Sequence, residues 1–541
     1  MAEASIQGSD QAAALPPGGV HAADAVKSER PTVEHGVRLA VVAVSVILAT
    51  LLEMIDTTIV NVALPNIQGN LGATIDEGPY VVTGYIVASV VIVPLTPWLQ
   101  ARFGLKRYYL ASILIFTAAS VMCGLPGSFT ELVIWRIIQG IGGGGLISTS
   151  QTILRDVFPD DKQGTAQGIF ALGVIIGPTL GPLIGGYITD NLDWRWCFFV
   201  NAPLGLIATL LVVSFLRELE RPRRLSLDGV GLVLLTVGLG SMQFVLDQGE
   251  RKDWFSDGSI RSFSALAIIG IATFIVWELR GARSPIVDLR VLRHPGVWGG
   301  SLLGATVGLA LYGSLIILPQ YTQTLLGFTA LLSGQLISVR ALAMASLMPL
   351  GVKLATGGRL DPRLQIGAGM ALLGASSLML ASVTTSDTPF GALAPSLIVA
   401  GFGLSQIFVP LQLSIFAGLD QAEVPKAASF FNLARQLGGS VAIALLVTLL
   451  DRTNAQHQTS LAGAVTLASP AAGEFLRVHG GSTSSTSRAL GELTHIVATQ
   501  ASALAYADVA RISAYVTLLL TPFVLVLRRS SAPVNLAKIE H

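Results

Sequence analysis

Fourteen apolar runs, each about 20 residues or longer, occupy most of this 541-residue sequence. An α-helix of that length crosses the hydrocarbon core of a bilayer, because all of its backbone hydrogen bonds are made within the helix. Only 12% of the residues are charged, about half the share in soluble domains, which excludes a soluble enzyme. The sequence therefore predicts an all-α integral membrane protein with helices at about 38–65, 79–101, 107–126, 129–153, 165–189, 197–216, 228–248, 260–280, 297–318, 331–355, 364–385, 390–416, 427–450 and 509–527.

Lysine and arginine are concentrated in every second link between the predicted helices. If the N-terminus is cytoplasmic, the cytoplasmic segments hold 23 of the 34 basic residues, and the short external links hold four. Because short cytoplasmic loops of membrane proteins are enriched in Lys and Arg, we expect both termini in the cytoplasm. The polar segment before the first helix lacks the apolar centre of a signal peptide and is expected to be a disordered tail.

Charge, cysteine content and motifs argue against several other classes of protein. A formal net charge of +1 gives no overall attraction to nucleic acid. Cys123 and Cys197 lie in or beside apolar runs and are expected to pack as small hydrophobic residues. The sequence has no zinc-ligand spacing, Gly-rich phosphate loop or Ser–His–Asp arrangement, so we expect no enzyme activity and no bound metal. A channel is disfavoured because no repeated filter segment is visible.

The first predicted helix contains two acids, Glu53 and Asp56, in an otherwise apolar stretch. An acidic side chain near the bilayer centre costs about 2.5–3.5 kcal/mol, so such residues usually serve a function. At ~100° per residue, Glu53, Asp56 and Thr57 share one face of the helix. We expect this face to line a polar cavity, with one or both acids carrying protons.

Three arginines also lie inside predicted helices: Arg136, Arg340 and Arg435. We expect each to face a cavity or a charged partner, and an ion pair that only joins two helices is the alternative. Counted from the outer helix ends, Asp56 lies ~12 Å deep and Arg136 ~10 Å deep. Gln139 lies close to the level of Glu53. These depths allow the fourth helix to place a cation and an amide beside the two acids.

The fifth predicted helix combines four glycines and two prolines: Gly173, Gly177, Gly181, Gly185, Pro178 and Pro182. Glycines at intervals of four residues form a stripe that drifts only ~40° per step, and such a stripe lets a second helix approach closely. Each proline removes one intrahelical hydrogen bond and bends the helix. Ordinary small-residue packing is the alternative, although it accounts poorly for all six residues together.

The link between the second and third helices is short and basic, with Arg102, Gly104, Lys106 and Arg107. One interpretation is positive charge that only fixes the topology. The other is a cytoplasmic gating loop, which pairs with a helix end and separates from it when the protein changes state.

Several of these stretches resemble the major facilitator superfamily, and within it the fourteen-helix drug:proton antiporters of the EmrB/QacA type. The resemblance covers about 38–530, with the motifs in the family's order and spacing. The strongest matches are MIDTTIVNVALPNIQGNLGA in the first helix, RIIQGIGGGG in the fourth, GVIIGPTLGPLIGG in the fifth and DWRWCFFVNAPLG before the sixth. Weaker matches are LPQYTQTLLGFTALLSG and FFNLARQLGGSVA.

The resemblance implies two six-helix bundles with two inserted helices between them. The implied divisions are a tail at 1–37, a first bundle at 38–216, a linker with the inserted helices at 217–296, a second bundle at 297–530 that includes a long periplasmic loop at 451–508, and a tail at 531–541. It also implies a multi-pass protein of the bacterial inner membrane. Asp56 then couples transport to protons, with Arg136 as its partner and no cofactor besides the proton.

Two departures from the family pattern affect this interpretation. The link after the second helix has Pro97, Ala101 and Leu105 where the family usually has Gly, Asp and Arg. The missing Asp is the usual ion-pairing member of the gating loop, so a latch here needs another acid. Glu53 is an acid beyond the usual Asp, and we expect it to be a second proton or cation site.

The function implied is proton-coupled efflux of amphipathic toxic compounds by alternating access, with multidrug resistance as the outcome. An uptake symporter or facilitator of the same fold is the alternative. EmrB-like permeases work with a periplasmic adaptor and an outer-membrane channel, which suggests by analogy that 451–508 contacts an adaptor. A passive linker is the alternative for that segment.

Overall fold

The computed structural model describes residues 36–74, 77–218, 226–282, 285–357, 360–465, 469–479 and 483–527. Over these ranges the chain consists of helices and short links, without a β-strand. The predicted tail 531–541, and nearly all of the predicted tail 1–37, lie outside the described residues.

Each of the fourteen predicted runs is helical over most of its length. The first half of the chain forms α1 (Val37–Leu71), α2 (Tyr80–Phe103), α3 (Leu105–Cys123), α4 (Phe129–Gly143), α5 (Leu146–Val157), α6 (Gln163–Asn191), α7 (Trp196–Phe199) and α8 (Asn201–Phe215). Next come α9 (Gly229–Gln248) and α10 (Gly258–Val276). The second half forms α11 (Pro295–Gln320), α12 (Ala330–Thr356), α13 (Pro362–Val383), α14 (Phe390–Phe416), α15 (Val424–Ala464), α16 (Pro470–His479) and α17 (Thr483–Leu520).

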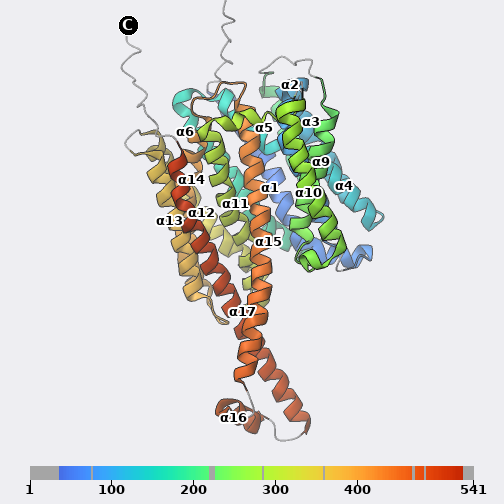
Figure 1. Cartoon of the computed structure of the whole chain (residues 1–541), viewed down its shortest axis with the longest axis vertical. Coiled ribbons are helices and arrows are strands. Elements are labelled where there is room, and N and C mark those ends of the chain that lie inside the picture. Colours follow the sequence, from blue (N-terminus) through green and yellow to red (C-terminus); the bar gives the residue numbers. More distant parts are fainter. Residues whose placement is uncertain are drawn as a thin grey trace, which may run out of the picture.

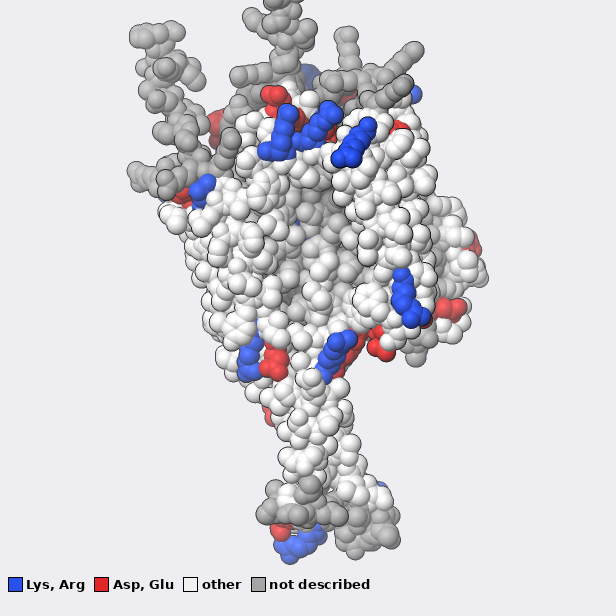
Figure 2. Space-filling model, in the orientation of Figure 1, with Lys and Arg blue, Asp and Glu red and all other residues white. Residues whose placement is uncertain are grey.

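The surface of the described helices suits a lipid environment. By length and composition, twelve helical spans among the described residues could cross a membrane. The other two of the fourteen predicted membrane helices correspond to α3 and α11. A fourteen-helix architecture is therefore compatible with the structure. Large apolar side chains point outward on several helices, with Ile268, Leu342 and Leu519 at least 69% exposed. In the face shown in Figure 2, charged side chains gather at two levels with a band of uncharged surface between them. Such a band is stable against hydrocarbon rather than water.

The helices pack as two groups (Figure 1). In the first half, α1 packs against α6, and α4 against both α2 and α3. In the second half, α11 packs against α15, and α14 against both α12 and α13. The halves meet where α6 faces α12 and α14, and where α15 faces α2 and α5, while α9 and α10 pair with each other and contact α2 through α9. The residue boundaries of the two bundles stay a prediction.

A run of glycines interrupts the fourth predicted helix, so that α4 ends at Gly143 and α5 begins at Leu146. A side chain at Gly140 would overlap the backbone of Tyr85, and one at Gly144 would overlap the backbone of Ser89. Glycine therefore lets the backbones of α2 and α4 touch, which brings α2 close to the polar residues of α4.

The predicted loop at 451–508 is largely helical, because α15 continues to Ala464 and α17 begins at Thr483. Figure 1 shows the two helices projecting together beyond the bundle. His457 Nε2 and Asp508 Oδ2 lie 2.8 Å apart, which ties α15 to α17 near the base of this projection. The sequence here is rich in alanine, the strongest helix former, and this explains why the helices extend further than the apolar runs.

Candidate functional site

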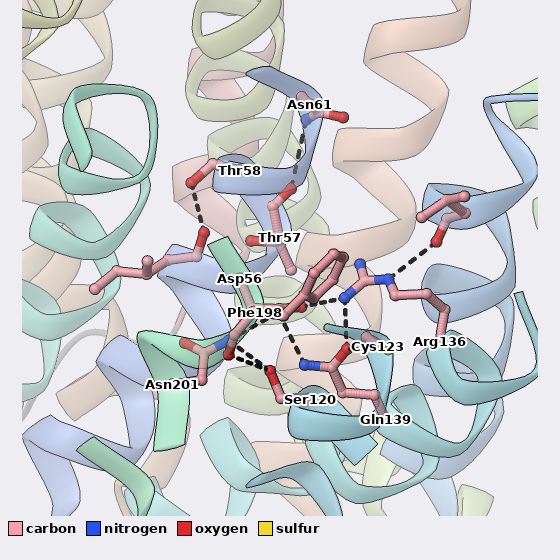
Figure 3. Close-up of polar contacts among 12 residues, drawn as sticks. Asp56, Thr57, Thr58, Asn61, Ser120, Cys123, Arg136, Gln139, Phe198 and Asn201 are labelled. Atoms are coloured by element: carbon pink, nitrogen blue, oxygen red, sulfur yellow. Dashed lines mark hydrogen bonds and ion pairs between the residues drawn. The ribbon is translucent and has the colours of Figure 1, made fainter. Parts of the chain in front are cut away.

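Asp56 of α1 and Arg136 of α4 form an ion pair in the interior of the first half of the chain. Asp56 Oδ2 and Arg136 Nη1 lie 2.5 Å apart, and the two side chains are 0% and 1% exposed. A charged pair at this depth has lost its hydration and needs further hydrogen bonds to offset that loss. Figure 3 shows the polar side chains that surround it.

Two amides complete the surroundings of the Asp56 carboxylate. Gln139 Nε2 and Asn201 Nδ2 both donate to Asp56 Oδ1, at 2.8 and 3.0 Å. Arg136 Nη1 also donates to Gln139 Oε1 at 2.7 Å, and Asn201 Nδ2 donates to Ser120 Oγ at 3.0 Å. The network therefore joins α1, α3, α4 and α8. A change in the charge of Asp56 alters hydrogen bonds that connect all four helices.

The backbone and rings of neighbouring helices hold the Arg136 guanidinium. Arg136 Nε donates to the carbonyl of Val81 at 3.0 Å. The guanidinium carbon lies 4.5 Å from the ring centre of Tyr85 and 5.8 Å from that of Phe198, positions that allow cation–π attraction. Arg136 thus keeps its position through contacts that do not depend on Asp56.

The glycine stripe of α6 faces the helix that carries the two acids. A side chain at Gly177 would overlap Met54, and one at Gly181 would overlap Thr58. At Gly173 an added Cβ would lie 3.5 Å from Thr50, an ordinary contact. Close approach is therefore required around 177–185, directly beside Asp56, and α6 runs unbroken through Pro178 and Pro182.

Glu53 lies apart from the Asp56 network, although it is only three residues away. Its side chain is 6% exposed, and its Oε2 has no hydrogen-bond partner among the residues that the structure describes. The backbone N–H of Ile147 on α5 hydrogen-bonds the carboxylate, and Arg435 of α15 is a cation whose charge acts on it. Gln139, which the sequence places near the level of Glu53, hydrogen-bonds Asp56 instead.

Polar contacts between the halves lie close to Glu53. Asn432 Nδ2 of α15 donates to Gln151 Oε1 of α5 at 2.5 Å and to Ser148 Oγ at 3.3 Å. Arg435 Nη2 donates to Asn432 Oδ1 at 3.4 Å. Arg435 and Arg340 are 3% and 4% exposed, so both intramembrane cations of the second half are buried.

The basic link between α2 and α3 is bound to its own half of the chain. Gly104 adopts a φ of +88°, a conformation that favours glycine. The Lys106 N–H donates to Glu218 Oε1 at 3.0 Å, and Lys106 Nζ donates to the Val213 carbonyl at 2.8 Å. Arg102 lies in the last turn of α2, and Arg107 is exposed on α3. These two contacts fix the loop to the end of α8 and to Glu218, three residues beyond it.

Sequence reasoning missed three residues of the network: Tyr85, Ser120 and Asn201. Of the three, Asn201 has the clearest signal in the sequence. It is a polar residue near the start of an apolar run and lies within the DWRWCFFVNAPLG motif. Tyr85 and Ser120 carry no such signal, since tyrosine and serine are common in membrane helices. Cys123 and Cys197 are free and buried, and no group of three potential metal-ligating His, Cys, Asp or Glu side chains occurs among the described residues.

A lipid-facing helical bundle in two packed groups, with buried charges on facing helices, defines a membrane transporter. The profile of the Major Facilitator Superfamily matches residues 46–443, and the chain belongs to this superfamily. It is 34% identical to the multidrug export protein EmrB of Escherichia coli K12 over 432 residues, which cover 80% of this chain and 84% of EmrB.

Two further relatives and one solved structure agree with this assignment. The chain is 32% identical to the probable multidrug resistance protein EmrY of E. coli K12, over 92% of this chain and 97% of EmrY. It is 35% identical to the fatty acid resistance protein FarB of Neisseria gonorrhoeae, over 80% of this chain and 84% of FarB. The human organic anion transporter MFSD10 has the same fold, with a TM-score of 0.55 and 15% identity over 88% of this chain and 99% of that one.

Proposed function

We propose that the chain exports amphipathic small molecules from the bacterial cytoplasm, through the inner membrane, in exchange for protons. The similar protein EmrB is named a multidrug export protein, which supports efflux of more than one compound. The observation that carries the proton coupling is the Asp56 carboxylate, which is fully buried and accepts hydrogen bonds from Arg136, Gln139 and Asn201. A carboxylate with these partners must rearrange them when it takes up a proton.

Protonation of Asp56 changes the contacts of α1. A neutral carboxylic acid attracts a guanidinium much less strongly than a carboxylate does, whereas Arg136 keeps its charge at every physiological pH. The proton therefore loosens α1 from α4 and leaves α4 fixed to α2. Because α1 packs on the glycine face of α6, and α6 faces α12, the change reaches the boundary between the halves.

The proton gradient supplies the free energy for export. Moving one proton inward is worth about 2.3 kcal/mol per 100 mV, with any pH gradient in addition. The substrate shifts the transporter only if it prefers one state, so it should bind when the acids are ionised and leave when they are protonated. Glu53 is the second proton site in this proposal, because its Oε2 has no hydrogen-bond partner in the described part of the chain and the charge of Arg435 acts on it across the boundary.

The contacts between the halves suggest which state is present. Ser429 and Asn432 of α15 bond to α2 and α5 at the end of the bundle that carries the α2–α3 link. Basic residues concentrate in the links at this end, so in our proposal it faces the cytoplasm and is closed.

Transport in membrane vesicles tests the function. Inside-out vesicles with an imposed proton gradient should accumulate a fluorescent drug and release protons when drug is added. Asp56→Asn should abolish coupled transport and Glu53→Gln should weaken it, while Asp193→Asn, at an exposed acid paired with Arg195, should leave it unchanged. If both intramembrane variants transport normally, the carboxylate mechanism is wrong, and drug movement in the opposite direction would indicate an uptake symporter.

We also propose that the α15–α17 projection binds a periplasmic adaptor, which links the permease to an outer-membrane channel. The projection extends beyond the bundle (Figure 1). Leu490 and Ile496 of α17 are 46% and 45% exposed, and Val478 of α16, which packs on α17, is 63% exposed. Deletion of 478–488 should remove adaptor crosslinking and leave proton-coupled transport in vesicles intact. Unchanged crosslinking would favour a passive linker.

A further inference from the structure

The segment that leads from α10 to α11 lies across the end of the bundle that carries the α2–α3 link. Its residues 285–288 are referred to as the strap. Ile286 and Val287 are 3% and 5% exposed and belong to an apolar cluster with Val90 and Leu95 of α2 and Phe274 of α10. The strap is therefore packed on the first half of the chain and on the inserted helices, and Phe430, Leu433 and Leu437 of α15 pack against the same cluster.

A buried acid in the π-helical turn Trp277–Gly281, which directly follows α10, fixes the backbone of the strap. Glu278 Oε1 accepts hydrogen bonds from the N–H groups of Ile286 and Val287, at 3.2 and 3.3 Å. Trp277, one residue earlier, donates from Nε1 to Asp228 Oδ2 at 2.7 Å, which ties the end of α10 to the start of α9. The strap is thus held in place by the inserted helices.

The last residue of the strap forms an ion pair with the second half of the chain. Asp288 Oδ2 and Lys426 Nζ lie 2.8 Å apart, with the two side chains 28% and 32% exposed. Lys426 lies in the first turn of α15, and Asp288 Oδ1 also accepts the N–H of Arg290 at 3.1 Å. The pair therefore connects the body formed by α2, α9 and α10 to α15.

A cavity of about 270 Å³ lies beneath this pair. Its walls come from both halves: Pro97 and Ala101 of α2, Thr152 of α5, and Lys426 of α15, with Asp288 at the strap. The small side chain of Ala101 leaves space between α2 and Lys426. Lys426 lies three residues, about one helical turn, before Ser429, whose Oγ bonds the Val93 carbonyl of α2 directly.

We propose that Asp288 and Lys426 form the charged latch that holds this end of the transporter closed, in place of a carboxylate that the chain lacks at Ala101. The latch rests on the proposed transport cycle, because it opens when α15 separates from α2 and α5. It is distinct from the proton site, since neither residue touches the Asp56 network. The inserted helices then have a role in the cycle, which is to hold the strap against α2.

A buried reporter can detect opening of the latch without any transport. Thr152 lines the cavity and is 1% exposed, so Thr152→Cys should react slowly with a membrane-impermeant maleimide in inside-out vesicles. Asp288→Asn and Lys426→Gln should each raise the labelling rate roughly two- to fivefold, the range for a half-exposed ion pair. The double variant should label no faster than either single variant, because both remove the same interaction.

Two further variants make the test specific. Adding Ala101→Asp to Asp288→Asn should return labelling to the wild-type rate, because position 101 shares the cavity with Lys426. Glu423→Gln is the matched control, since Glu423 pairs at the same end with Arg293 at 3.7 Å and His294 at 3.2 Å, directly before α11, rather than with the strap. Thermal unfolding in detergent confirms that each variant is folded.

The latch proposal is wrong if Thr152→Cys is labelled at the wild-type rate in Asp288→Asn or Lys426→Gln. It is also wrong if Glu423→Gln raises the labelling rate as much as these two variants do. It is also overturned if Ala101→Asp leaves the labelling of Asp288→Asn unchanged. Failure of the proton mechanism gives a different result, since Asp56→Asn would then transport normally while the labelling of the latch variants still rises.

Discussion

Asp56 and Arg136 are separated by 80 positions in the sequence, and their side chains meet at 2.5 Å with almost no exposure to solvent. The two residues depend on each other unequally. Arg136 has the Val81 carbonyl and the Tyr85 ring in addition to Asp56, whereas Arg136 is the one cation among the donors to Asp56 that the described residues provide. A proton added to Asp56 therefore releases α1 and leaves Arg136 in position.

The first prediction concerns stability. Arg136→Gln should lower the free energy of unfolding by about 3–5 kcal/mol, because it leaves a buried carboxylate without its cation. The double variant Asp56→Asn/Arg136→Gln should regain most of that loss, since both charges are gone. Thermal unfolding in detergent measures both effects. A double variant less stable than Arg136→Gln alone would show that Asp56 does not need this cation.

The second prediction concerns Asn201, which donates to Asp56 Oδ1 at 3.0 Å. Asn201→Ala should destabilise the ionised form of Asp56 by about 1–3 kcal/mol, the usual cost of one lost hydrogen bond to a charged group. The pH profile of drug–proton exchange should therefore change. Asn191→Ala is the control, because Asn191 is exposed and bonds the Tyr187 carbonyl within its own helix. Equal profiles for both variants would remove Asn201 from the coupling site.

The membrane helices could be predicted because a chain segment in hydrocarbon has no water to bond its backbone N–H and C=O groups. A run such as 390–416 must satisfy its own backbone hydrogen bonds, so its apolar length alone predicts a helix, and α14 has the same bounds. The helical segments beyond the membrane are harder to predict from hydropathy. The sequence over which α15 continues to Ala464 is rich in alanine but polar. Its length is set by helix propensity and by packing against α17, which a hydropathy pattern does not contain.

The candidate site was only partly visible in the sequence. The cost of burying charge singles out Asp56 and Arg136, and helix depth brings them to one level. Depth does not give the rotation of a helix about its axis, so it could not show that Gln139 bonds Asp56 or that Glu53 faces α5 and α15. The strap was invisible for a related reason, since Asp288 gains its partner only when the halves pack together.

The third prediction tests the glycine stripe of α6. Gly181→Ala should cost about 1–3 kcal/mol of stability and reduce transport, because its Cβ would overlap Thr58 and lie 3.1 Å from the carbonyl of Ile55. Gly173→Ala is the matched control, since its Cβ would meet Thr50 at an ordinary 3.5 Å. Adding Thr58→Ala to Gly181→Ala should restore part of the loss. If the two glycine variants behave alike, close contact at 181 is not required.

The fourth prediction separates the latch from the proton site by pH. Burial alone would raise the pKa of Asp288, but the hydrogen bond and charge of Lys426, with help from Arg290, hold this pKa below its ordinary value. A carboxyl with a lowered pKa contributes its full stabilisation above the ordinary value of ~3.9 and loses it as the pH falls through the lowered pKa.

Labelling of Thr152→Cys, corrected for the reactivity of the thiol, should therefore stay constant from about pH 6 to about pH 8 in vesicles without a proton gradient. Drug–proton exchange should change over the same range, because the proton is one of the two species exchanged. The comparison uses Asp288→Asn as its reference, since that variant has no carboxyl group at the latch and should show the same flat profile at a higher rate. A wild-type labelling rate that follows the pH profile of exchange would mean that the latch is controlled by the proton site rather than by its own ion pair.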